Sequence, residues 1–148
     1  MENFKELLEK SRRKMLIGFA AGFGIWRGSY IFKHLISPSH VFHMILPYLL
    51  IISFVGWIIW IYYLIKIIKL SGIIRKDHSL NISLNNEYIQ YIRLKAFSVS
   101  FIILVLIQPV LLFASFFISI TVSIIIDINI SIAVLSFIIT FLIFDREQ

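Results

Sequence analysis

The stretch AFSVSFIILVLIQPVLLFASFFISITVSIII, residues 96–126, runs for 31 residues without a charged side chain. As an α-helix it would be about 46 Å long, well beyond the roughly 30 Å hydrocarbon core of a bilayer. The apolar character continues to residue 144, and Asp127 is the one charged residue on the way. These 49 residues therefore predict two membrane-spanning helices joined by a tight turn.

Two positions compete for this turn. Asp127-Ile128-Asn129 offers turn-forming residues, but a turn there leaves only the 14 residues 131–144 for the last span. A turn at SITVS, residues 119–123, gives spans 96–118 and 124–144, which both have the length that a bilayer requires. We expect the turn at 119–123.

Two further apolar blocks precede this region. Residues 15–36 form the first predicted span and residues 42–65 the second, separated by the turn-forming SPSH at 37–40. Pro47 lies near the outer end of the second span, where neighbouring helices can absorb a kink. Aromatic residues near the other end of the second span are typical of a belt at the membrane interface; they are Trp57, Trp60, Tyr62 and Tyr63.

The 14 lysines and arginines fall almost entirely on alternate sides of these spans. Eleven precede the first span or lie between the second and the third, and the short segments 37–41 and 119–123 hold none. Cytoplasmic ends of spans carry the excess of Lys and Arg, so both termini are predicted to be cytoplasmic. The predicted fold is all-α and integral to the membrane, with four transmembrane helices in two helical hairpins, N-in/C-in. Its parts are a juxtamembrane amphipathic helix 1–14, a first hairpin 15–69, a cytoplasmic loop and helix start 70–95, and a second hairpin 96–148.

The N-terminal segment 1–14 has Phe4, Leu7 and Leu8 on one helical face, which indicates anchoring at the membrane interface. A solvated tail is the alternative. The apolar run 15–26 after a basic stretch also resembles a signal peptide. Because the preceding segment is long and acidic, and because the apolar run continues, we expect a retained anchor.

The connection 70–95 is the one extended polar segment. Ser71-Gly72 is expected to end the second helix, and residues 77–86 have the composition of a loop. Asn85-Asn86-Glu87 can cap the helix that leads into the third span.

That helix begins with EYIQYIRLKA, from Glu87 to Ala96, ten of the 148 residues. It resembles the acidic–x5–Arg–x–Lys–Ala start of a span in several small bacterial membrane proteins of unknown function, although Tyr and Ile stand where those proteins usually carry more charge. The resemblance implies a bacterial source, and hence the cytoplasmic (inner) membrane. It implies no activity.

The whole chain has the composition of a membrane protein. Its residues are 59% hydrophobic and 15% charged, whereas an average soluble domain is about 25% charged. The net charge of +6 comes from cations beside the spans, so it indicates an anionic membrane surface and no nucleic acid. The absence of cysteine excludes thiolate metal sites, disulfides, cysteine nucleophiles and haem attached through cysteine.

Arg27 is the strongest candidate for a functional residue. It lies about 20 Å along the first helix, where inserting an arginine costs about 2.5–3.5 kcal/mol. Such a residue usually faces a partner charge or a water-filled cavity. The only acid in the four spans is Asp127, and we expect the two side chains to pair in the outer half of the membrane. Alternatively, Arg27 reaches the outer headgroups and Asp127 lies in a solvated turn.

Gln108 precedes Pro109 in the middle of the third span. Proline leaves one carbonyl without its helical hydrogen bond, and a glutamine amide can bond to another helix. The depth of Gln108 is close to that of Arg27, so the two could form a polar layer suited to a substrate or an ion. A kinked helix with a satisfied amide is the structural alternative, and it is the one that we expect.

Four of the six glycines lie in the first span, in two Gly-x-x-x-Gly frames. Small residues at this spacing let helix backbones approach closely in lipid. We expect this packing within the chain, with packing between copies as the alternative. The frames are Gly18/Gly22 and Gly24/Gly28.

Three histidines lie within ten residues at the outer end of the first hairpin: His34, His40 and His43. Histidine binds metals and haem, but this spacing matches no recognised metal motif, and axial haem ligands would have to lie within the spans. We expect interfacial histidines and predict no cofactor.

Function follows less directly from the sequence. No Walker loop, His-Glu-x-x-His motif, nucleophile elbow or paired acid site occurs, so no enzyme is predicted. The sequence favours a non-catalytic multi-span protein that acts through helix–helix contacts, as a homo-oligomer, an accessory subunit, or an effector or immunity-type factor. Its partners would be the lipid bilayer and either another copy or another membrane protein. One alternative is an oligomeric channel or transporter in which Arg27 lines an anion-favouring path. A histidine-ligated haem or metal protein is the second.

Overall fold

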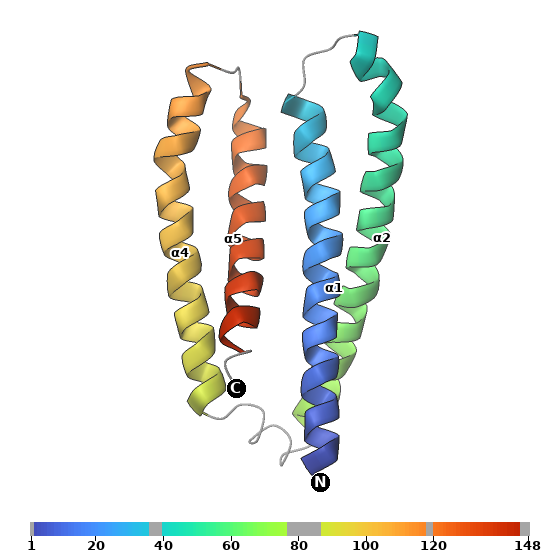
Figure 1. Cartoon of the computed structure of the whole chain (residues 1–148), viewed down its shortest axis with the longest axis vertical. Helices are drawn as coiled ribbons and strands as arrows, with labels where there is room; N and C mark the ends of the chain where they lie inside the picture. The colour runs from blue at the N-terminus through green and yellow to red at the C-terminus, as the bar shows by residue number, and fades with distance from the viewer. Residues whose placement is uncertain (1, 36–39, 77–86, 118–119, 146–148) are drawn as a thin grey trace.

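The computed structural model describes residues 2–35, 40–76, 87–117 and 120–145, and these ranges form four helices (Figure 1). Each helix contains a segment of 23 to 32 residues that is long and apolar enough to cross a membrane. The helices are α1 (Glu2–Leu35), α2 (His40–Lys76), α4 (Glu87–Ser115) and α5 (Val122–Phe144).

The helix ends settle the position of the last turn. α4 ends at Ser115 and α5 begins at Val122, directly after Thr121. The turn therefore overlaps the 119–123 position, and the competing residues Asp127 to Asn129 lie inside α5.

Two other boundaries differ from the expectation. Ser71-Gly72 does not end the second helix, because α2 continues to Lys76. Glycine in a helix costs only about 1 kcal/mol relative to alanine, which the apolar residues around it offset.

The predicted loop 77–86, with its Asn85-Asn86 cap, lies outside the described residues. At the other end of the chain, the predicted juxtamembrane helix and the first predicted span are joined in one continuous helix, α1, from Glu2 to Leu35.

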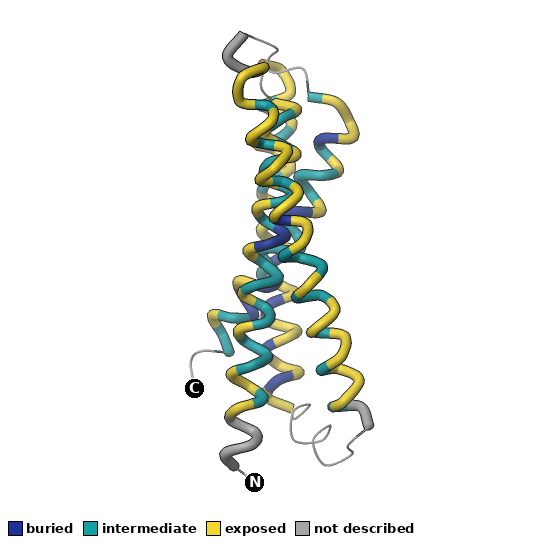
Figure 2. Tube along the Cα trace, turned by 90° about the vertical axis from the view of Figure 1, so that its right-hand side faces the viewer, coloured by how far each residue is buried: buried dark blue, intermediate teal, exposed yellow. Residues whose placement is uncertain are grey.

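The helices lie in a row. Among the described helices, extensive contacts join α1 with α2, α1 with α5, and α4 with α5, and neighbours run antiparallel. α1 and α5 are thus the central helices, and α2 and α4 the outer ones. Turned by 90°, the molecule is narrow (Figure 2). In contrast to a closed four-helix bundle, each outer helix has one extensive partner.

This arrangement leaves most apolar side chains exposed. A cluster of buried residues, Ile92, Ala96 and Phe141, lies between α4 and α5, and Leu16 of α1 packs against it. Most large apolar residues of α2 and α4 are exposed, among them Tyr48, Leu106 and Phe113 at 66–67%. Apolar surface on this scale is characteristic of a protein surrounded by lipid.

Candidate functional site

An ion pair joins the two central helices. Arg27 of α1 donates from Nη2 to Oδ1 of Asp127 on α5, at 2.5 Å. The two side chains are 17% and 16% exposed, and the guanidinium carbon of Arg27 lies 5.3 Å from the ring centroid of Trp26. The structure thus brings together the two charges that the sequence analysis expected to pair.

A second polar contact joins α5 to α4 at nearly the same level. Nε2 of Gln108 donates to Oδ1 of Asn129 at 2.9 Å and to the carbonyl oxygen of Leu104 at 3.0 Å. Asp127 and Asn129 are two residues apart, about 200° around the helix, so they face α1 and α4 respectively. Arg27 and Gln108 therefore share a layer, but α5 separates them.

Asn129 is a site residue that the sequence analysis missed. It was assigned to a competing turn, and its partner Gln108 was expected to pair with an unspecified helix. Two polar side chains at i and i+2 within an apolar helix are the signal that could have identified it, because such residues face two different neighbours.

A second ion pair at the end of the molecule near the termini was also missed. Nη2 of Arg12 donates to Oδ1 of Asp145 at 2.8 Å, with side chains 17% and 12% exposed. Arg12 had been counted among the cations that set topology. Asp127 and Asp145 are 18 residues apart, about five helical turns, and so lie on one face of α5. That spacing was the available signal.

The Arg12→Ala variant is expected to lose about 1 kcal/mol in free energy of unfolding, because this ion pair lies near the end of the spans, where water and salt screen it. The loss should shrink as ionic strength rises. Thermal unfolding in detergent at low and high salt measures it. Arg13→Ala, which removes the same charge one position away, is the control, and an equal loss in both variants would contradict the assignment to the Arg12–Asp145 pair.

One of the two glycine frames packs within the chain. A Cβ at Gly22 would lie 2.6 Å from the backbone nitrogen of Trp60, and one at Gly18 would lie 2.3 Å from the Tyr63 ring. The same close approach occurs from the side of α2, since a Cβ at Gly56 would lie 2.7 Å from the backbone nitrogen of Trp26. α1 and α2 therefore touch backbone to backbone.

The second frame does not take part in such a contact. A Cβ at Gly24 would be at an ordinary 3.8 Å from Leu135 of α5, and one at Gly28 would meet no described atom within 4 Å. Both positions have room for a Cβ atom.

The aromatic residues of α2 divide between two roles. Trp60 is stacked on Trp26, with centroids 5.0 Å apart, and it also contacts Phe19 and Phe23. Trp60 therefore packs between α1 and α2, while its depth at the membrane interface stays a prediction. Tyr62 is exposed, and Nζ of Lys66 lies 4.6 Å from its ring centroid.

Two of the three candidate histidines, His34 and His43, have side chains that the structure describes. His34 is exposed, with its ring 4.6 Å from that of Tyr30, and His43 is exposed as well. The side chain of His40 lies outside the described part of the chain. Within that part, no three potential metal ligands of the His, Cys, Asp or Glu type gather.

No protein-family model, curated protein or solved structure matches the chain.

Proposed function

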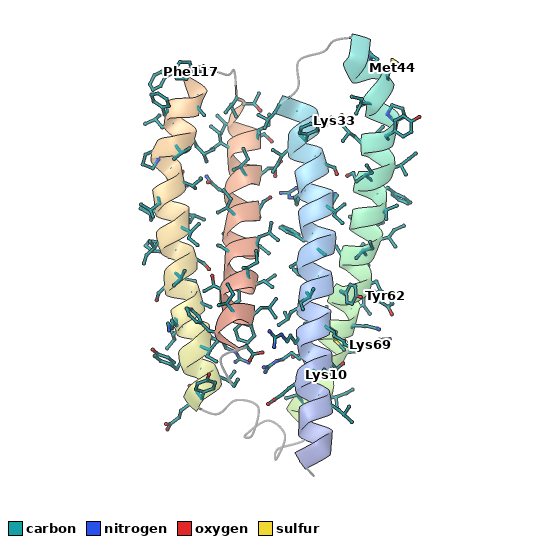
Figure 3. The ribbon with its side chains drawn as sticks, viewed as in Figure 1. Lys10, Lys33, Met44, Tyr62, Lys69 and Phe117 are labelled. Atoms are coloured by element: carbon teal, nitrogen blue, oxygen red, sulfur yellow. The ribbon has the colours of Figure 1, made fainter. Side chains whose placement is uncertain are left out.

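We propose that the chain is an integral protein of the bacterial cytoplasmic membrane, with two transmembrane hairpins and both termini in the cytoplasm. The charge distribution supports this topology. Lys10 and Lys69 lie at the end of the molecule that holds the termini, and Lys33 lies towards the opposite end (Figure 3). An excess of cations at one end is what the positive-inside rule requires of the cytoplasmic side.

Cysteine labelling tests the topology directly, because the chain has no cysteine of its own. Ser71→Cys and Thr121→Cys place single thiols on exposed residues at opposite ends. An impermeant maleimide should label Thr121→Cys in intact spheroplasts, and Ser71→Cys only after permeabilisation. The reverse pattern would overturn the orientation.

We propose further that the protein is non-catalytic and acts through helix–helix contacts, as a homo-oligomer, an accessory subunit, or an effector or immunity-type factor. The observation that supports this proposal is the open row of helices, in which each outer helix presents a long apolar face to its surroundings. In lipid, close packing and interhelical hydrogen bonds drive association, so such faces can join further helices. A partner seated against α2 or α4 would complete the packing that the row leaves open.

The anion-path alternative has less support. The charge of Arg27 is neutralised by Asp127, and both side chains are mostly buried between two helices. A residue that attracts anions from a water-filled path needs an exposed, uncompensated charge. The haem or metal alternative lacks a cluster of facing histidines among the described residues.

The mass of the particle in mild detergent, combined with ion flux in liposomes, tests the proposed mode of action. We expect a particle larger than one chain, or a stable complex with a second membrane protein, and no chloride flux. A strictly monomeric particle without a partner would overturn the proposal, and so would an oligomer that conducts chloride.

A further inference from the structure

Two amide side chains reach the surface of the molecule at the predicted middle of the membrane. Gln108 of α4 is exposed, and Asn129 of α5 is half-buried. Gln108 lies about 18 Å along α4 from residue 96, the start of the third predicted span, and so beyond the midpoint of the roughly 30 Å hydrocarbon core. Acyl chains offer no hydrogen bonds at that depth, so a polar group facing them is unfavourable unless another polypeptide satisfies it.

Contacts within the chain use only part of the hydrogen-bonding capacity of these amides. Nε2 of Gln108 donates to Oδ1 of Asn129 at 2.9 Å and to the carbonyl oxygen of Leu104 at 3.0 Å, so both of its N–H groups are used. Among the described residues, Oε1 of Gln108 accepts no hydrogen bond and Nδ2 of Asn129 donates none. The amide pair therefore presents an unused acceptor beside an unused donor.

A second copy of the chain supplies the groups that match them. A two-fold axis along the membrane normal leaves depth unchanged, so the amide pairs of two copies lie at the same level in the membrane. Such an axis exchanges the two unused groups, and Nδ2 of Asn129 in each copy can donate to Oε1 of Gln108 in the other. The amide pair is thus complementary to itself.

An apolar groove adjoins the amide pair. It lies between α4 and α5, has a volume of about 590 Å³, is open to the surroundings, and extends along the helices for about 10 Å. Its walls include Leu104, one helical turn from Gln108, and Ala133, one turn from Asn129, so the groove and the amides share one face of the row. Phe101, on the α4 wall, is 59% exposed. This face therefore offers both a hollow and a bulky side chain beside it.

Charges do not oppose an approach of two copies at this face. Arg93 and Lys95 lie about 20 Å of helix rise from Gln108. The charges of Arg27 and Asp127 compensate one another between α5 and α1. Two copies can therefore meet at the amide pair without bringing uncompensated like charges together at that depth.

We propose that a second copy of the chain binds across this face, related by a two-fold axis along the membrane normal. Reciprocal hydrogen bonds from Asn129 of each copy to Gln108 of the other join the two chains, and side chains such as Phe101 of one copy fill the groove of the other. The proposal rests on the membrane placement and on the helix–helix mode of action given above, and it names the partner and the face.

Energy transfer between chains labelled at Ser71→Cys, measured as they are diluted in liposomes, tests the hydrogen bonds. We expect transfer that varies linearly with the acceptor fraction, as a two-chain assembly requires. Gln108→Leu combined with Asn129→Leu should weaken association about tenfold, the order of effect of interhelical hydrogen bonds in lipid. Because both amides are replaced, neither loses a partner within the chain, and the helix content by circular dichroism should be unchanged. Ser29→Leu removes a hydroxyl that bonds to its own helix α1, and it should leave association unchanged.

Filling the groove provides an arm that leaves the amides intact. Ala133→Leu should weaken association to a similar extent, whereas Ala21→Leu, the same change at an exposed position of α1, should not. Oxidation of single-cysteine variants in membranes locates the face. Phe101→Cys should form a disulfide-linked dimer. Leu106→Cys, 67% exposed in the native residue and about 140° around α4, should not.

The outcomes separate this interface from the proposed mode of action. An unchanged dissociation constant in both the double leucine variant and Ala133→Leu would overturn the interface, and so would cross-linking at Leu106→Cys in place of Phe101→Cys. A stable complex of one copy with a different membrane protein would overturn the second copy as the partner. A monomer without any partner would instead overturn the helix–helix mode of action itself.

Discussion

The Asp127→Leu variant is expected to lose on the order of 3 kcal/mol in free energy of unfolding, and Arg27→Leu somewhat less. Each change leaves one charge between α1 and α5 without its partner. The two unpaired charges that these variants leave behind are not equivalent. A carboxylate left alone in a low-dielectric site can take up a proton and become neutral, whereas a guanidinium stays charged and must find water or a headgroup. Unfolding in mixed micelles with rising dodecyl sulfate, followed by circular dichroism, measures both losses.

Two double variants distinguish the stabilisation that comes from the Arg27–Asp127 pair from the contributions of the residues around it. Arg27→Leu with Asp127→Leu should recover most of the stability, since replacing both charges by apolar groups leaves neither unsatisfied. Arg27→Asp with Asp127→Arg should also recover part of it, because the attraction is restored with its direction reversed. Additive losses in the double leucine variant would show that the two side chains do not stabilise one another, and would contradict the pairing as a stabilising contact.

The sequence predicted this pair because charges are scarce in the spans. The lengths of the two spans placed the turn before Asp127. Asp127 therefore lay within the last span, and it was the only acid in the spans that could pair with Arg27. The same reasoning predicted four helices, since the length of an apolar run is set by the thickness of the bilayer. Both conclusions depend on features that a membrane constrains strongly: the number of charges within the spans and the length of each apolar run.

The order of the helices could not be predicted in the same way. In water, the buried face of a helix is apolar and the exposed face polar, so periodicity reveals which side packs. Here both faces are apolar: Ile92 is buried in the α4–α5 contact, and Leu94, two residues on, is 68% exposed. Packing in lipid depends on shape instead, which is why Gly56 of α2, a glycine outside any Gly-x-x-x-Gly frame, was not recognised as a contact residue.

The contact of α1 with α2 gives the other large prediction. Gly22→Ala adds a single methyl group, whose carbon would lie 2.6 Å from the backbone nitrogen of Trp60. Backbone cannot rotate away as a side chain can, so the two helices must separate along the whole contact. We expect a loss of about 2 kcal/mol, in spite of the better helix propensity of alanine. Gly56→Ala, which meets the backbone of Trp26 from the other side, should behave alike.

A graded series makes this prediction sharp. Gly18→Ala should lose less than Gly22→Ala, because its new methyl meets the end of the Tyr63 ring, which can swing aside. Gly28→Ala meets no described atom and should be neutral or more stable, by up to about 1 kcal/mol from helix propensity alone. Detergent stability in the order Gly28→Ala, Gly18→Ala, Gly22→Ala is the expected result. If Gly28→Ala were the most damaging, the second glycine frame would have to pack against another chain, and the close contact within the chain would not dominate stability.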